Sequence, residues 1–249
     1  MTPRVLVIAG LDPSGAAGLL ADVAAVAATG ARAWAVATAI TAQGQGGGRG
    51  YQAATPEFLL AQLGAVLGGR ERPRAVKTGM LATAVLARVL SDLLAERPVA
   101  RLPLVVDPVL LTSSGLPLLD TGGLSPGEAL APLLGRARLA TPNLDELARL
   151  TGSDTSTDEA AIRAARRLPS RAVLVKGGHR AGAPVDLLVE GRRLTRLPGR
   201  RRPGTARGTG CRLASAIAGH LARGKGLEDA VRQAKRFIER YLDEQATTH

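Results

Sequence analysis

Residues 5–28, VLVIAGLDPSGAAGLLADVAAVAA, join an apolar run, a turn that contains glycine and an alanine-rich stretch. The run Val5–Gly10 carries no polar side chain, which is typical of a strand buried on both faces of a parallel sheet. The stretch Gly18–Ala28 is rich in alanine and leucine, which favour helix. A buried strand followed by a helix predicts an α/β fold, in which helices cover a parallel sheet.

The same unit recurs along the chain. Further buried strands are predicted at Ala33–Ile40, Ala75–Met80, Leu102–Val109, Leu139–Asn143 and Ala172–Gly178. Further helices are predicted to end at Leu94 and to cover Leu144–Leu150, Arg212–Arg223 and Leu227–Gln245. Alternating apolar runs on both sides of Glu190-Gly191 predict a hairpin within Asp186–Gly199. No linker separates these segments, so we expect residues 1–249 to form one domain.

The composition indicates a globular protein of the cytoplasm. Hydrophobic residues make up 45% of the chain and charged residues 22%, as in proteins with a packed core. Cys211 is the only cysteine, which excludes an internal disulfide. The N-terminus lacks the apolar core of a signal peptide, and no stretch approaches the roughly 18 uncharged apolar residues of a membrane span. We therefore expect a cytoplasmic protein without a membrane partner.

The formal net charge of +12 raises the question of nucleic-acid binding. The positive charges are nearly all arginines spread from Arg4 to Arg240, with one dense run within 192–202. Aromatic residues make up 2% of the chain, which leaves little for stacking on bases. We interpret the arginines as a coding bias and expect no nucleic-acid partner. The dense run is expected to decorate a solvated edge or to help hold a polyphosphate.

Candidate ligand-binding residues follow the predicted strands. Ligands of open α/β sheets bind beyond the carboxyl ends of the strands. The residues at or after those ends are Asp12, Gln43, Met80, Asp107, Asn143 and Lys176. The glycine-rich stretch Gly44–Gly50 directly follows a strand, and we expect a mobile loop of the active site there.

The sequence Gly208-Thr209-Gly210-Cys211 places the single thiol where a glycine turn enters a helix. Glycines let several backbone N–H groups converge, and the helix adds the positive end of its dipole, so the turn can hold an anion. A thiol at such a position is expected to have a lowered pKa and to accept a proton. The alternative is a small cysteine that packs the helix against the sheet.

With these motifs, the sequence resembles the hydroxymethylpyrimidine/phosphomethylpyrimidine kinases of thiamine biosynthesis, which belong to the ribokinase-like superfamily. The similarity extends from Val5 to about Leu242 and includes the motifs IAGLDPSGAAGLLAD, TAITAQ, VKTGML, VVDPVLLTSSGLPLL, TPNLDEL, VLVKGGH and GTGCRLASAIA. It implies a three-layer sandwich with a mostly parallel central sheet and helices on both faces. It also implies a kinase that uses ATP and Mg²⁺ to phosphorylate the aminopyrimidine and its monophosphate, and that forms a homodimer.

The resemblance implies roles around the phosphates. Cys211 is expected to take the proton of the substrate's hydroxymethyl group. The N–H groups of Gly208, Thr209 and Gly210 are expected to stabilise the transferred phosphoryl group. Lys176 is expected to contact the phosphates of ATP, and its alternative is a surface lysine at a strand end.

The resemblance also implies a magnesium site. Asn143 and Glu146 form an Asn-x-x-Glu pattern and are expected to position Mg²⁺ largely through water, with Asp107 joining that network. The alternative is helix capping, because the same residue types start helices well. Both interpretations can hold together.

The positions implied for the pyrimidine are Gly10, Ala17, Asp22, Gln43, Met80 and Val109. Gln43 offers a donor and an acceptor to an aminopyrimidine edge, whereas Met80 and Val109 are expected to contact the faces of the ring. Asp22 interrupts an apolar helix, where an unpaired carboxylate is costly, so a structural role is the alternative to substrate contact.

Several residues depart from the family pattern. Arg207 replaces a histidine before the glycine turn, Arg212 replaces a hydroxyl residue after the cysteine, and Ala16 replaces a glycine. These changes surround Gly208-Thr209-Gly210, which we call the phosphate turn. They therefore bear on the rate and the substrate preference more than on the fold. The alternative functions are a pyridoxal kinase, which acts on a similar hydroxymethyl-bearing ring, and a pyrimidine-binding sensor that has lost phosphoryl transfer.

Overall fold

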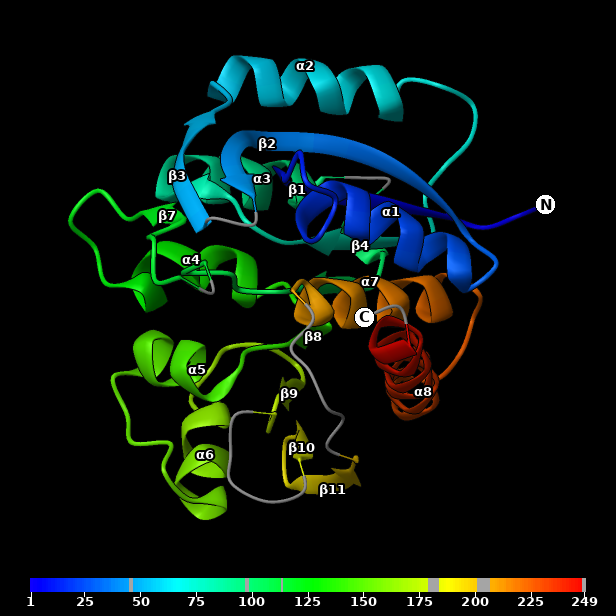
Figure 1. Cartoon of the computed structure of the whole chain (residues 1–249). Helices are drawn as coiled ribbons and strands as arrows, with labels where there is room; N and C mark the ends of the chain where they lie inside the picture. Colours follow the sequence, from blue (N-terminus) through cyan, green and yellow to red (C-terminus); the bar gives the residue numbers. More distant parts are fainter. Residues whose placement is uncertain (45–46, 97–98, 113, 179–183, 201–206, 248–249) are drawn as a thin grey trace.

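A nine-stranded sheet forms the middle layer of the protein (Figure 1). The computed structural model describes residues 1–44, 47–96, 99–112, 114–178, 184–200 and 207–247. The strand order is β11-β10-β9-β8-β6-β4-β1-β2-β3. The strands that run parallel to one another are β1 (Arg4–Leu11), β2 (Arg32–Gly44), β4 (Ala75–Thr78), β6 (Leu104–Val106), β8 (Leu139–Ala140) and β9 (Val173–Val175).

Antiparallel strands complete both edges of the sheet. At one edge β3 (Gly47–Ala53) pairs with β2. At the other edge β10 (Val185–Glu190) pairs with β9 and with β11 (Arg193–Pro198), which confirms the predicted hairpin. A small second sheet joins β5 (Ala82–Thr83) to β7 (Leu119–Asp120).

Helices cover both faces of the large sheet. One layer contains α1 (Gly18–Ala28), α7 (Thr209–Ala222) and α8 (Leu227–Thr247). The other layer contains α2 (Pro56–Leu67), α3 (Ala84–Ala95), α4 (Pro126–Leu134), α5 (Leu144–Thr151) and α6 (Asp158–Ala165). A 3₁₀ turn, η1 (Val99–Arg101), follows α3 in the chain. The predicted three-layer α/β sandwich with a mostly parallel sheet is thus confirmed.

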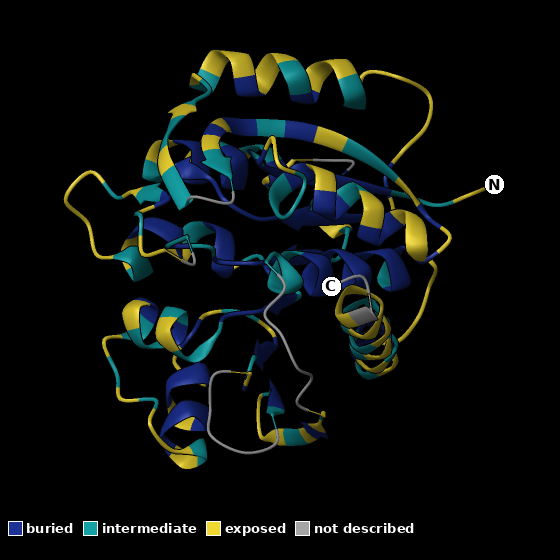
Figure 2. Ribbon diagram, in the orientation of Figure 1, coloured by how far each residue is buried: buried dark blue, intermediate teal, exposed yellow. Residues whose placement is uncertain are grey.

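Alternate residues of β1 belong to two different cores. Leu6 and Ile8 pack with the α2–α6 layer, whereas Val5 and Val7 pack with α1, α7 and α8. All four side chains have no exposed surface, which explains the uninterrupted apolar run in the sequence. Figure 2 shows that α7 is also buried over most of its length after a partly exposed first turn, whereas α2 and α8 each present an exposed side.

The segment after β2 differs from its prediction. The loop predicted at Gly44–Gly50 is wrong for its described part, because β2 extends to Gly44 and β3 begins at Gly47. Residues 45–46 of that stretch lie outside the described residues. Gly48 pairs with Gln43 beside an irregularity in the register. Backbone pairing with β2 requires no strand-favouring side chain, so the glycine-rich composition hid this strand.

Helix α7 begins three residues earlier than predicted. The predicted start is Arg212, but the helix starts at Thr209, so Cys211 lies within its first turn. Sequence reasoning also placed no element at α2, α4 or α6. No helix in the described ranges is both long and apolar enough to cross a membrane.

Candidate active site

The N-terminus of α7 meets the N-terminus of α1 beside the central strands. Gly208 precedes α7 with a φ of 72°, and a Cβ there would clash with the carbonyl oxygen of Ala16. Gly18 begins α1 with a φ of 60°, and a Cβ there would clash with the carbonyl oxygen of Gly10. Because Gly208 has no Cβ, the start of α7 can lie against the residues just before α1, and Gly18 lets the start of α1 lie against the end of β1. The predicted phosphate turn therefore lies against the start of α1.

Lys176 lies between the phosphate turn and two carboxylates. Its Nζ is 3.0 Å from Oδ1 of Asp107 and 3.6 Å from Oε2 of Glu146. A Cβ on Gly210 would lie 3.1 Å from the same nitrogen, so the ammonium lies against the first turn of α7, which begins at Thr209. The structure thus brings together the residues predicted for phosphate and for metal.

The charges of this cluster shift one another's pKa values. Burial acts to lower the pKa of Lys176, but the carboxylates of Asp107 and Glu146 outweigh it, and the pKa is raised. Burial acts to raise the pKa of Asp107, but Lys176, Lys77 and a hydrogen bond from Thr141 lower it below its ordinary value. Burial raises the pKa of Glu146. Lys176 therefore stays an ammonium at neutral pH, as phosphate binding requires.

Asn143 and Glu146 cap helix α5. The backbone N–H of Glu146 donates to Oδ1 of Asn143 over 2.7 Å, and the backbone N–H of Asn143 donates to Oε2 of Glu146 over 2.7 Å. The capping interpretation of these residues is confirmed. Among the described residues, no three His, Cys, Asp or Glu side chains are placed to hold a metal ion.

Cys211 lies in the first turn of α7 and is partly exposed. Desolvation by the surrounding protein raises the pKa of its thiol to about 12, although Lys77 and a hydrogen bond from the Gly18 N–H act to lower it. Asp107 and Asp22 add to the increase. The prediction of a lowered thiol pKa is wrong for this structure, because lost hydration and two nearby carboxylates outweigh the helix terminus.

Lys77 is a charged residue near the thiol that sequence reasoning missed. Its Nζ lies 2.7 Å from Oδ2 of Asp22, and neither side chain has exposed surface. The hydroxyl of Ser215 donates a 2.8 Å hydrogen bond to the other carboxylate oxygen of Asp22. Both oxygens of Asp22 are thus used inside the fold, which favours its structural interpretation over substrate contact. The signal in the sequence was a lysine inside a buried strand motif, VKTGML.

The other positions predicted for the pyrimidine lie at several strand ends. Met80 lies against Gly10, where a Cβ would be 2.7 Å from Sδ, and its carbonyl accepts a 2.6 Å hydrogen bond from the hydroxyl of Thr38. Gln43 is partly exposed near the end of β2, and Val109 is partly exposed after β6. The structure therefore brings Gly10 and Met80 into contact and places Gln43 near the end of β2 and Val109 in the segment after β6.

Arg207 connects the phosphate turn to the ends of β1 and β2. Its Nη1 donates to the carbonyl oxygen of Gly44 over 2.9 Å, and its Nη2 lies 3.4 Å from Oδ2 of Asp12. The same Asp12 oxygen accepts a 3.2 Å hydrogen bond from the N–H of Ala17. The arginine that departs from the family pattern therefore holds together segments that carry predicted substrate residues.

Arg212 has a structural position. Its guanidinium donates to the carbonyl oxygens of Ala16 over 2.6 Å and Gly15 over 3.3 Å, and it lies 4.5 Å from the ring centroid of Tyr241. The side chain is buried between the turn after β1 and helix α8. The same Nη1 also donates to the carbonyl oxygen of Arg207 over 3.3 Å, and a Cβ on Gly208 would lie 2.8 Å from it. Arg212 thus ties the turn after β1 to the glycine turn before α7.

Fold and site define the class of this protein as a ribokinase-like kinase. A crystal structure of phosphomethylpyrimidine kinase from Clostridium difficile is 31% identical with a TM-score of 0.81, and the match covers 97% of this chain and all of that one. An ADP complex of the Bacillus subtilis pyridoxal kinase is 28% identical with a TM-score of 0.84, over 96% of this chain and 91% of that one.

The chain belongs to the phosphomethylpyrimidine kinase family, whose sequence profile matches residues 12–249. The hydroxymethylpyrimidine/phosphomethylpyrimidine kinase of Streptomyces coelicolor is 41% identical over 95% of this chain and 87% of its own length. The thiamine biosynthesis bifunctional protein ThiED of Geobacter sulfurreducens is 42% identical over 94% of this chain, which spans 48% of that longer protein. The resemblance inferred from the motifs is confirmed, and the protein is a kinase.

Proposed function

We propose that the protein transfers the γ-phosphoryl group of ATP to the hydroxymethyl group of 4-amino-5-hydroxymethyl-2-methylpyrimidine, and then phosphorylates the monophosphate so formed. The Streptomyces coelicolor relative carries both activities in its name. The observation that carries the proposal is the Lys176 ammonium against Gly210, next in sequence to Cys211. The Lys176 ammonium, which can bind an anion, and the Cys211 thiol therefore both lie at the first turn of α7.

The phosphate end of the proposed site consists of backbone and one lysine. The N–H groups of Gly208, Thr209 and Gly210 belong to the start of α7, where helices leave such groups without partners. Transfer of a phosphoryl group depends mainly on positioning and charge neutralisation. We expect Lys176 to exchange part of its contact with Asp107 and Glu146 for phosphate oxygens, because its ammonium already faces the turn.

Cys211 is the proposed base. Its thiolate takes the proton of the substrate hydroxyl while the hydroxyl oxygen forms its bond to the γ-phosphorus. The bond from that phosphorus to the bridging oxygen of ATP breaks, and ADP leaves with the electron pair. The thiol then returns its proton to solvent. A thiol pKa of about 12 makes the thiolate scarce at neutral pH, so this role predicts a rate that rises with pH.

Magnesium is proposed as the ion that accompanies ATP. The side chains of Asn143, Glu146 and Asp107 supply the oxygen atoms that Mg²⁺ and its water ligands prefer. They fit a hydrated ion rather than a bare one, because Asp107 and Glu146 already pair with Lys176 and Asn143 caps α5. When bound, the ion supplies positive charge to the phosphates.

The aminopyrimidine is proposed to lie across the strand ends. Met80 and Val109 would contact the faces of the ring, and Gln43 would donate to and accept from its polar edge. Gly10 leaves room for the Met80 side chain. The backbone of Ala17 would also line the pyrimidine site, and its N–H donates a hydrogen bond to the Asp12 carboxylate.

A coupled assay of ADP formation tests this function. Wild type and Cys211→Ala are each given ATP with hydroxymethylpyrimidine, with pyridoxal or with no acceptor. We expect pyrimidine-dependent turnover in wild type and a loss of about 10²–10⁴-fold in kcat for the variant, with little change in KM. Pyrimidine binding by wild type without turnover would favour the sensor function. Full activity of Cys211→Ala would remove the cysteine from the mechanism and leave the kinase in place.

A pyridoxal kinase is the second candidate. The similarity to the Bacillus subtilis pyridoxal kinase, with a TM-score of 0.84, supports it. The ratio of kcat/KM for the two rings decides between the candidates, since discrimination is measured by that ratio. A higher value for pyridoxal would reverse the order of our two candidates.

We further propose that the protein acts in the cytoplasm as a homodimer and binds neither nucleic acid nor membrane. The family resemblance supports the dimer, and the dispersed arginines argue against a nucleic-acid surface. Light scattering of the purified chain should give about twice its mass of 25.6 kDa. A mass near that of one chain would contradict the dimer.

A further inference from the structure

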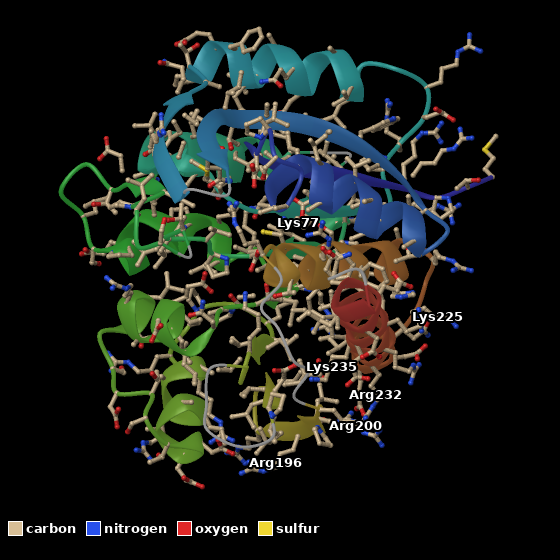
Figure 3. The ribbon with its side chains drawn as sticks, in the orientation of Figure 1. Lys77, Arg196, Arg200, Lys225, Arg232 and Lys235 are labelled. Atoms are coloured by element: carbon tan, nitrogen blue, oxygen red, sulfur yellow. The ribbon has the colours of Figure 1, made fainter. Side chains whose placement is uncertain are left out.

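Lys77 lies inside the protein between helices α1 and α7, as its position in Figure 3 shows. Its strand, β4, lies next to β1 in the middle of the sheet. The ammonium reaches Asp22 of α1 at 2.7 Å, and the second oxygen of that carboxylate accepts a hydrogen bond from Ser215 of α7. Three elements that are far apart in the sequence therefore meet at one ion pair.

The ion pair lies one helical turn away from the thiol. Asp22 follows Gly18 by four residues on α1, and Ser215 follows Cys211 by four residues on α7, so each pair shares a helix face. The backbone N–H of Gly18 lies close enough to the Cys211 thiol to act to lower its pKa. Two layers of contact thus join α1 to α7, with the thiol in one and the Asp22 carboxylate in the other.

The Lys77–Asp22 ion pair is fully buried, and burial of charge is unfavourable for folding. Removing two charges from water opposes folding, and well-packed apolar residues in their place often stabilise a fold equally well. The neighbouring strand end also makes room for the charge, because a Cβ on Gly79 would lie 2.8 Å from the Lys77 nitrogen. The fold therefore maintains a cation beside Cys211 at a cost in stability.

We propose that Lys77 is the counter-cation of the Cys211 thiolate, a positioning residue that Asp22 holds in place beside the thiol. Its catalytic consequence rests on the proposed function, in which Cys211 is the base. Lys77 has no exposed surface, so it acts on the thiol through its charge and not through the substrate. In a desolvated setting such a charge acts more strongly than it does in water.

The charges that act on the thiol come from several parts of the fold. Lys77 of β4 acts to lower the thiol pKa, whereas Asp107 after β6 and Asp22 of α1 act to raise it. The charges of Lys176 and Cys211 also interact. Among these charges Lys77 has the largest effect on the thiol. Burial acts to lower the pKa of Lys77, but Asp22, Cys211 and Asp107 outweigh it and keep the ammonium protonated.

The single cysteine allows a direct test on the intact chain. Cys211 is the only thiol in the chain, and the rate at which iodoacetamide alkylates it, followed by mass spectrometry of its peptide, reports the thiolate fraction at fixed pH. The rate is measured from pH 7 to 10 in wild type and in Lys77→Met/Asp22→Asn, which removes both charges and avoids a lone buried carboxylate. The matched control is Lys225→Met/Asp229→Asn, which makes the same two changes in an exposed ion pair.

We expect Lys77→Met/Asp22→Asn to react more slowly at each pH, because Lys77 lowers the thiol pKa by more than Asp22 raises it, and each pKa unit corresponds to a tenfold change in thiolate. The control should react like wild type. Lys77→Arg, which keeps the charge, should retain most of the rate. An unchanged rate in Lys77→Met/Asp22→Asn would overturn the proposal. Full turnover by Cys211→Ala would instead refute the proposed base, while the alkylation rates would still test Lys77.

A second comparison keeps Lys77 intact, in case the double variant does not fold. Cys211→Asp and Cys211→Asn are nearly equal in size and differ in charge. If a counter-cation is present, the Asp variant should melt at a temperature no lower than the Asn variant at pH 8. A lower melting temperature for Cys211→Asp would show an unpaired buried anion and would contradict the proposal.

Discussion

Two lysine–carboxylate clusters lie close together in this kinase, one reachable from solvent and one sealed. Lys176 keeps 16% of its side chain exposed beside Asp107 and Glu146, whereas the side chains of Lys77 and Asp22 are 0% exposed. An ammonium with exposed surface can exchange a carboxylate for a phosphate. A fully enclosed ammonium can influence the chemistry only through its electric field. Burial therefore gives the same pair of side chains two different roles.

The clusters are linked through Asp107. Its carboxylate contacts Lys176 at 3.0 Å and also interacts electrostatically with Lys77 and with Cys211. A ligand that draws Lys176 away from Asp107 would thus change the field at the thiol. The difference between the clusters is thus one of access to solvent.

The sealed pair should show its largest effect on stability. Lys77→Met leaves the Asp22 carboxylate buried without its cation, so we expect the free energy of unfolding to fall by about 3–5 kcal/mol. Lys77→Met/Asp22→Asn should recover much of that loss, because no lone charge remains. Urea unfolding followed by circular dichroism measures both. If the double variant is no more stable than Lys77→Met, the loss of stability in Lys77→Met does not come from an unpaired Asp22 carboxylate.

The reachable cluster should show its largest effect on turnover. Lys176→Met removes one preorganised cation from the phosphates, and we expect kcat to fall about 10²–10³-fold. Lys235→Met is the control, since Lys235 is similarly buried and pairs with a carboxylate, Asp186. The control should keep its turnover even where its stability decreases. A comparable drop in kcat for both variants would mean that Lys176 acts through stability alone.

The thiol should impose a pH dependence on the rate. A pKa of about 12 leaves about 10⁻⁴ of the Cys211 thiol ionised at pH 8, and that fraction grows about tenfold for each pH unit up to the pKa. If the thiolate is the base, kcat should rise with the same slope between pH 7 and 9. The raised pKa of Lys176 keeps it charged in this range, so it does not counteract the rise. A flat profile with saturating substrates would contradict this dependence.

The cap of α5 should show the smallest effect. Asn143→Ala removes the side chain that accepts the N–H of Glu146, and we expect a loss of about 1 kcal/mol in the free energy of unfolding. Thr157→Ala removes the corresponding cap of α6, away from the clusters, and should cost a similar amount. If Asn143 also holds hydrated Mg²⁺, only Asn143→Ala should need more Mg²⁺ for half-maximal rate. If both variants need the same Mg²⁺ concentration for half-maximal rate, the only role of Asn143 is to cap α5.

Local patterns were sufficient for much of the fold. The apolar run of β1 and the hairpin around Glu190-Gly191 depend on neighbours in the chain, so periodicity and turn chemistry revealed them. The cap formed by Asn143 and Glu146 was visible for the same reason, since its partners are three residues apart. The strand β3 was missed because its glycines carry no side-chain signal and its pairing with β2 is made by the backbone.

The sequence by itself determined the class of fold, the glycine turn before α7 and the identity of the lysine at the end of β9, because each is written in consecutive residues. Only the tertiary structure decided the surroundings of the thiol. Lys77 and Asp22 are 55 residues apart, and Asp22 and Ser215 are 193 apart, so no local pattern announces their contact. The direction of the Cys211 pKa shift followed from burial and from charges on three other elements, and desolvation is a property of the packed molecule.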